Sequence, residues 1–124
     1  MKKILIVDDE PDQVYTVKTA LESSEDNFSV LGANGGKECF QLLKEHTPDL
    51  IILDIMMPEM SGWEVYDKIK DNPAWKNIPI VFLTARTDRV AENAGQFLGE
   101  DFLEKPIEMD QLKIRINRVF EKRD

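Results

Sequence analysis

A carboxylate stands directly after a run of four aliphatic residues in the middle of the chain, where Leu50-Ile51-Ile52-Leu53 is followed by Asp54. An unbroken apolar run of this length is typical of a strand that is buried on both faces, as in a parallel sheet. Open α/β sheets bind their ligands at the carboxyl ends of such strands. Asp54 is therefore the first candidate for chemistry, and the next question is which other polar groups reach the same edge.

Three other predicted strands are also followed by polar residues. These residues are Asp8 and Asp9 after residues 4–7, Thr84 after residues 78–83, and Lys105 after residues 101–104. If the strands run parallel, their carboxyl ends share one edge of the sheet. Carboxylates, a hydroxyl and an ammonium would then meet in one crevice.

Carboxylates brought this close repel one another and raise one another's pKa, and a single lysine cannot balance three of them. A hard divalent cation can, and Mg²⁺ binds one or two carboxylates while it keeps several waters and room for phosphate oxygens. We expect Asp9 and Asp54 to bind Mg²⁺ directly, with Mn²⁺ as the alternative ion. Asp8 would hold a coordinated water, and the backbone carbonyl of Met56 would complete the protein's ligands.

A metal ligand of this kind still has a second carboxylate oxygen. That oxygen of Asp54 could attack phosphorus and form an aspartyl phosphate. Mg²⁺ and Lys105 would offset the transferred charge, and Thr84 would donate a hydrogen bond to a phosphoryl oxygen.

Each of these residues also has a purely structural explanation. The acids after the first strand could complement the positive end of a helix, Asp54 and Thr84 could cap the segments that follow them, and Lys105 could be a solvated surface lysine. The functional explanation is favoured because every predicted strand except the second contributes to the same rim.

Helical periodicity separates the apolar runs and sets the fold class. Helices are predicted over residues 11–23, over about 35–46, over 63–70 and over 109–120. A fourth helix, between the last two of these, is predicted to begin at a cap formed by Thr87 or Asp88. A further strand is predicted at residues 28–33. Alternating strands and helices indicate an α/β fold with helices on both faces of a parallel sheet. The prediction is a single domain, residues 1–124, with a flavodoxin-like (βα)5 fold and strand order 2-1-3-4-5.

The composition narrows the class of protein. A net charge of −8 argues against direct nucleic-acid binding by this domain and against binding to an anionic membrane. A single cysteine, Cys39, leaves no internal disulfide and suits a reducing cytoplasm. No signal peptide or membrane span is visible in the sequence. We therefore expect a cytoplasmic protein.

The chain resembles the receiver domains of two-component response regulators, and the resemblance runs from Lys3 to about Arg118. The residues that carry it are the pair Asp8-Asp9, the segment 53–58 with Gly62 after it, the segment Leu83-Thr84-Ala85, and Lys105-Pro106. The resemblance implies that Asp54 accepts a phosphoryl group from a histidine kinase or phosphotransfer protein in a Mg²⁺-dependent reaction. It also implies a cis peptide before Pro106, and no enzymatic activity beyond self-phosphorylation and dephosphorylation.

The same resemblance assigns a switch and a pair of rate-tuning positions. Thr84 would be coupled to an aromatic residue on the fifth strand, here Phe102. Their coupled movement would remodel the face formed by the fourth helix, the fifth strand and the last helix. Met56 and Arg86 would tune the lifetime of the phosphoryl group. The interval between Thr84 and Lys105 looks one residue shorter than is usual in the family. We expect Phe97 and Leu98 in that interval to be buried in the core, and the alternative is that they are exposed apolar contacts for a partner.

A homodimer through that face is one arrangement that the resemblance indicates, with Asp101 and Arg115 pairing between protomers. The alternative is a surface ion pair that contributes little. Ala91 stands where the winged-helix branch of the family carries a basic residue, which argues against the dimer.

Three other functions fit a sheet with an acidic rim. An aspartyl-phosphate hydrolase would need a second Asp at position 56, where this chain has Met56. A flavin or nucleotide site would need a glycine- or hydroxyl-rich loop after the first strand, and Asp8-Asp9-Glu10 would repel phosphate there. An inert pseudo-receiver would lack one of the five polar site residues, and this chain has all of them.

Overall fold

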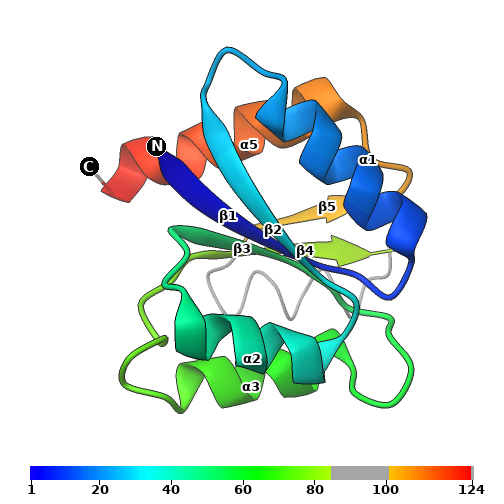
Figure 1. Cartoon of the computed structure of the whole chain (residues 1–124), viewed down its shortest axis with the longest axis vertical. Coiled ribbons are helices and arrows are strands. Elements are labelled where there is room, and N and C mark those ends of the chain that lie inside the picture. Colours follow the sequence, from blue (N-terminus) through cyan, green and yellow to red (C-terminus); the bar gives the residue numbers. More distant parts are fainter. Residues whose placement is uncertain (85–100, 124) are drawn as a thin grey trace.

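The computed structural model describes residues 1–84 and 101–123. Within these ranges five parallel strands form one sheet in the order β2-β1-β3-β4-β5 (Figure 1). The strands are β1 (Lys2–Val7), β2 (Phe28–Ala33), β3 (Leu50–Asp54), β4 (Ile80–Thr84) and β5 (Asp101–Glu104). The predicted fold class and strand order are therefore confirmed.

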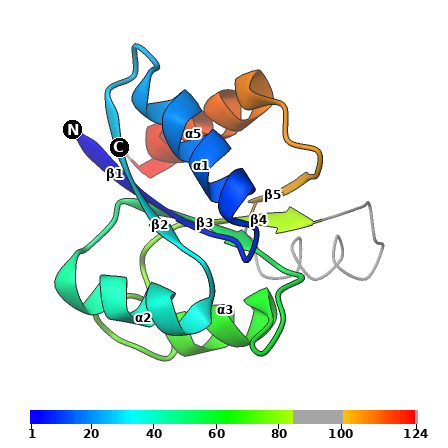
Figure 2. The same cartoon turned by 45° about the vertical axis from the view of Figure 1, so that its right-hand side comes forward.

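Helices cover both faces of the sheet. In Figure 1, α1 and α5 lie on one face, whereas α2 and α3 lie on the other, and the turned view of Figure 2 shows the same arrangement. The helices are α1 (Pro11–Glu22), α2 (Gly36–Glu45), α3 (Gly62–Lys70) and α5 (Met109–Arg123). The predicted fourth helix lies outside the described residues, and so do Thr87, Asp88, Ala91, Phe97 and Leu98.

The sheet separates two apolar clusters. One cluster joins alternate strand residues such as Leu53 and Phe82 to the inner faces of α2 and α3, where Cys39 is fully buried. The other joins Ile52 and its strand neighbours to α1 and α5. The central strands are apolar throughout because both of their faces are buried.

The register of the central strands brings the ends of three strands together. Val7 of β1 pairs with Leu53 of β3, and Asp54 pairs with Leu83 of β4. The Ile55 N–H donates to the Leu83 carbonyl at 3.0 Å, so backbone pairing continues one residue beyond Asp54. The Asp54 backbone is thus fixed on the side of β4.

The fourth strand begins two residues later than the apolar pattern predicts, at Ile80 rather than at Ile78. Ile78 instead donates its N–H to the Trp75 carbonyl at 3.0 Å and so belongs to the preceding turn. Pro79 follows and has no N–H to donate to a neighbouring strand. Hydrophobicity alone cannot separate a buried turn residue from the first residue of a strand.

Side chains of α1 occupy the outer edge of β2. Lys18 Nζ donates to the Val30 carbonyl at 2.8 Å, while Glu22 Oε2 accepts from the Val30 N–H at 3.1 Å. Lys18 and Glu22 also form an ion pair at 3.1 Å. Backbone groups on an exposed edge strand invite pairing with another chain, and here both groups of Val30 are satisfied internally.

The described helices include none that is both long enough and apolar enough to span a membrane.

Replacing Glu22 by Ala should destabilise the protein by about 1 kcal/mol at pH 7, because the Val30 N–H loses a charged acceptor. The lost ion pair with Lys18 adds little, because solvent screens it. The Val30 hydrogen bond first, and then Lys18, lower the pKa of Glu22 below its ordinary value of 4.5. The stabilisation should therefore be complete above about pH 5 and be lost as pH falls below 4.5. Urea unfolding at several pH values measures both effects. Glu45→Ala, at the last residue of α2, is the matched control, and equal losses in the two variants would contradict the role of Glu22.

Candidate functional site

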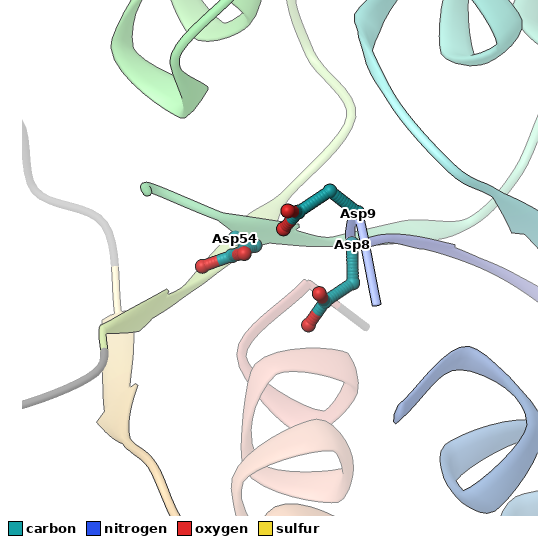
Figure 3. A group of neighbouring side chains, drawn as sticks. All are labelled: Asp8, Asp9 and Asp54. Carbon is teal, nitrogen blue, oxygen red and sulfur yellow. The ribbon is translucent and has the colours of Figure 1, made fainter. Parts of the chain in front are cut away.

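Three carboxylates converge at the carboxyl edge of the sheet. Asp8, Asp9 and Asp54 each place an oxygen within 4.8 Å of the others. Figure 3 shows that Asp8 and Asp9 leave the end of β1 in opposite directions, with the Asp9 carboxylate beside the end of β3. The sequence-based prediction that these residues share one crevice is confirmed.

Burial differs among the three acids. The side chains of Asp8 and Asp54 are 0% and 2% exposed, whereas Asp9 is partly exposed. A hollow of about 520 Å³ opens beside Asp9, lined by the loops after β2 and β3 and by the first part of α2. Solvent therefore reaches the site from the Asp9 side.

Lys105 brings the only positive side chain that the described residues place among these acids. Its Nζ lies 2.8 Å from Asp8 Oδ2 and 3.4 Å from Asp54 Oδ2. The Lys105–Pro106 peptide is cis, as the family resemblance implies. The Lys105 side chain is 13% exposed, so it is largely enclosed by the site.

The electrostatics follow from this packing. Burial first, and then the charge of Asp8, raise the pKa of Asp54 from 3.8 to about 7, although Lys105 and the Met56 N–H act in the opposite direction. Burial alone would lower the pKa of Lys105, but Asp8 and Asp54 outweigh it and the pKa is raised. Lys105 is therefore charged, while Asp54 titrates near neutral pH.

The donor set fits a hard divalent cation. Asp8 Oδ2 is fully buried and accepts no aligned hydrogen bond from the described residues, although it lies close to Lys105. The other available groups are carboxylate oxygens of Asp9 and Asp54. Oxygen ligands with excess negative charge are those that Mg²⁺ and Mn²⁺ accept.

The start of α3 forms one wall of the site at Gly62. A Cβ atom at this position would meet the backbone carbonyl of Asp54 and would lie 2.7 Å from Ile55 Cα. The Gly62 N–H donates to the Ile55 carbonyl at 2.9 Å. Ser61 caps the helix by accepting from the Glu64 N–H. Glycine therefore lets α3 press directly against the strand end that carries Asp54.

Met56 lies at the mouth of the site. Its N–H donates to Asp54 Oδ1 at 3.3 Å, and its side chain is 71% exposed. This places Met56 beside Asp54, as predicted. Thr84 ends β4 in register with Glu104 of β5, but its side chain lies outside the described residues, as does all of Arg86.

Phe102 and the Asp101–Arg115 pair lie on the far strand. Phe102 is partly buried and packs against the cluster that includes Phe82. Arg115 Nη1 lies 3.5 Å from Asp101 Oδ1 of the same chain, with both side chains about one-third exposed. Within a single chain these two residues already pair with each other.

Two residues received no separate role from the sequence. Glu10 Oε1 lies 3.8 Å from Lys105 Nζ. Its position between Asp9 and Pro11 could have indicated that its backbone is restricted. No sequence pattern around Gly62 predicts that it packs against Asp54, because the close approach of α3 to Asp54 depends on the tertiary structure.

A family model described as "Response regulator receiver domain" matches residues 4–117. The chain belongs to this family. As a receiver domain it is a component of two-component signalling, and the alternative of an unrelated flavin or nucleotide fold is set aside.

Relatives and solved structures agree with this assignment. The receiver domain is 39% identical over 115 residues to a probable cyclic di-GMP phosphodiesterase of Vibrio cholerae, covering 92% of this chain and 25% of that protein. It is 37% identical over 117 residues to the response regulator Rre1 of Synechocystis, covering 94% of this chain and 50% of that protein. The chemotaxis protein CheY4 of Vibrio cholerae superposes with a TM-score of 0.87 at 29% identity, covering 96% of this chain and 98% of that one.

The receiver domain spans a quarter and a half, respectively, of the lengths of these two relatives. Activities carried by the remainder of those proteins therefore say nothing about this chain. The phosphodiesterase name, in particular, belongs to a protein of which this chain matches only 25%.

Replacing Gly62 by Ala should destabilise the receiver domain by about 1–3 kcal/mol, because the new methyl group meets backbone atoms that cannot rotate away. Gly35→Ser is the matched control. Gly35 has open space around its Cα, and serine is favoured at its N-cap position, so this change should be neutral within about 0.5 kcal/mol. Urea unfolding compares the two variants. A harmless Gly62→Ala would contradict the close approach of α3.

Without a divalent cation, Asp54 should weaken the fold as pH rises. Its native pKa of about 7 lies above the ordinary value of 3.8, so the native state holds a proton that the unfolded state has lost. Stability should fall between about pH 4 and pH 7 and then level off. Asp54→Asn lacks this slope and should be more stable than wild type at pH 8 by on the order of 1–3 kcal/mol. Unfolding in EDTA measures the difference, and Mg²⁺ should reduce it. If the free energy of unfolding depended on pH in the same way in both proteins, the raised pKa of Asp54 would be refuted.

Proposed function

We propose that this receiver domain is a phosphorylation-activated switch in which Asp54 accepts a phosphoryl group from a histidine kinase or phosphotransfer protein. The observation that carries the proposal is the position of Asp54, buried at a strand end with Lys105 at 3.4 Å and two further carboxylates within 4.8 Å. A carboxylate that served only as a cap would need neither the burial nor the neighbouring Lys105 and carboxylates.

Asp9 and Asp54 would bind Mg²⁺, or Mn²⁺, directly, with Asp8 holding a coordinated water and the Met56 carbonyl as a further ligand. The bound cation would neutralise charge that develops on the phosphoryl oxygens. Three carboxylates against the single Lys105 ammonium, and a donor set made only of oxygens, support this assignment.

In the transfer step, a carboxylate oxygen of Asp54 forms a bond to phosphorus while the nitrogen–phosphorus bond of phosphohistidine breaks. The imidazole leaves with the electron pair and takes up a proton. Hydrolysis later breaks the oxygen–phosphorus bond, returning Asp54 and inorganic phosphate. These are the only reactions that we assign to the domain, so we do not class it as an enzyme.

Lys105 and Thr84 would hold the transferred group. The Lys105 ammonium already lies between Asp8 and Asp54, so a phosphoryl group on Asp54 would bring its oxygens within reach. Thr84, at the end of the neighbouring strand, would donate its hydroxyl to another phosphoryl oxygen. Both residues therefore act as catalytic groups in this proposal.

The signal would pass from Thr84 to Phe102 and remodel the face that includes β5 and α5. Phe102 is partly buried, so its ring has space to change its packing. Met56 and Arg86 would tune the phosphoryl lifetime. A homodimer through this face would require Asp101 and Arg115 to exchange their pairing within one chain for pairing between chains.

The remaining assignments concern the setting of the domain. We propose that residues 1–124 act as one receiver unit in the cytoplasm, where histidine kinases present their phosphohistidine. The net charge of −8 supports a role without direct nucleic-acid or membrane binding.

Incubation of the protein with acetyl phosphate and Mg²⁺ should add one phosphoryl group, seen as a mass increase in the intact protein. EDTA and Asp54→Asn should each abolish the adduct, and Lys105→Met should reduce its rate of formation by about tenfold or more. Asn keeps the shape of Asp54, so the variant separates loss of the nucleophile from loss of the fold. An adduct of equal yield in Asp54→Asn would defeat the proposal.

A further inference from the structure

Glu10 is the outermost acid of the site. Its side chain is 66% exposed, whereas those of Asp8 and Asp54 are almost completely buried. Its Oε1 lies 3.8 Å from the Lys105 ammonium. A charged molecule that comes close to Lys105 therefore lies near the exposed Glu10 charge as well as the two buried acids.

The backbone of Glu10 is held from several directions. Its N–H donates to Asp8 Oδ1 at 3.0 Å, and its carbonyl accepts from the N–H groups of Gln13 and Val14. Pro11 follows it and restricts it to the extended conformation that it adopts, with φ −95° and ψ 107°. The side chain thus begins from a fixed point beside Lys105.

A capping hydrogen bond does not explain why an acid stands here, although its charge also suits the N-terminus of α1. Glu10 is the N-cap of α1, but its side chain makes no capping hydrogen bond. Short polar side chains are preferred at N-caps because they reach the free N–H groups of the first turn. The Glu10 carboxylate instead faces Lys105, which indicates a role in the site.

We propose that Glu10 is a specificity-determining residue that disfavours small, doubly charged phosphodonors at Asp54, an inference that rests on the proposed function. The four acids at this edge outnumber Lys105 so strongly that the site stays negative even with a divalent cation bound. The Glu10 charge repels a free donor in proportion to the donor's own charge. A donor carried on a partner protein gains contacts elsewhere that offset this repulsion.

Two small donors separate charge from shape. Acetyl phosphate is a dianion near neutral pH, and its transfer breaks an oxygen–phosphorus bond with acetate as the leaving group. Phosphoramidate is mainly singly charged near neutral pH, and its transfer breaks a nitrogen–phosphorus bond with ammonia leaving after it takes up a proton. In both cases an Asp54 oxygen forms the new bond to phosphorus.

The experiment measures the second-order rate of adduct formation with each donor at saturating Mg²⁺ and low ionic strength. Glu10→Gln should raise the rate about three- to fivefold with acetyl phosphate, but only about twofold with phosphoramidate. Added salt at about 0.5 M should reduce both effects to less than about 1.5-fold, because it screens the charge. Glu10→Asp should stay close to wild type, since it keeps the charge.

Glu45→Gln makes the same change in net charge at the far end of α2 and should leave both rates unchanged. Equal acceleration with both donors, or acceleration that salt does not remove, would mean that Glu10 acts through shape and would overturn the inference. Unchanged rates in Glu10→Gln would do the same while leaving Asp54 as phosphoacceptor. Absence of any adduct on the wild-type protein would instead overturn the proposed function, and the inference with it.

Discussion

An ammonium group among carboxylates is the interaction on which the carboxyl edge of this sheet depends. Asp8 and Asp54 are buried side by side, and the charge of Asp8 raises the cost of ionising Asp54. Lys105 lies within 2.8 Å and 3.4 Å of them and offsets part of that cost. The compensation is incomplete, since the pKa of Asp54 still rises to about 7. The site therefore retains negative charge that a bound cation could neutralise.

The rest of the fold holds these groups rigidly. Asp54 follows a strand that is buried on both faces, its neighbour Ile55 is bonded to β4, and Gly62 allows α3 to pack against its carbonyl. A side chain on such a support loses little freedom when it binds a ligand, because that freedom was already lost on folding. The Asp54 carboxylate is thus held in place by the apolar packing below it rather than by contacts made at the surface.

Most of the fold and the position of the acids could be predicted from sequence, for a physical reason. Strands buried on both faces have unbroken apolar runs, and parallel strands place their ends together, so Asp8, Asp9, Asp54 and Lys105 follow from local pattern. The start of β4 could not be predicted, because Ile78 is apolar and buried although it lies in a turn before the strand. The Gly62 contact and the partner of Glu10 depend on how separate segments approach each other in space, and no local pattern encodes that. The pairing of Asp101 with Arg115 inside one chain is likewise a tertiary contact.

The sheet divides the interior into two cores that share only its backbone. Side chains of α2 and α3 pack against one face, and those of α1 and α5 pack against the other. Substitutions in different cores should therefore combine almost additively, since energetic coupling needs contact or a shared partner. Both cores end at the carboxyl edge, where Lys105 Nζ lies 3.4 Å from Asp54 Oδ2. A domain built in this way can accept sequence changes in either core independently, whereas the edge that carries Asp54 and Lys105 depends on both.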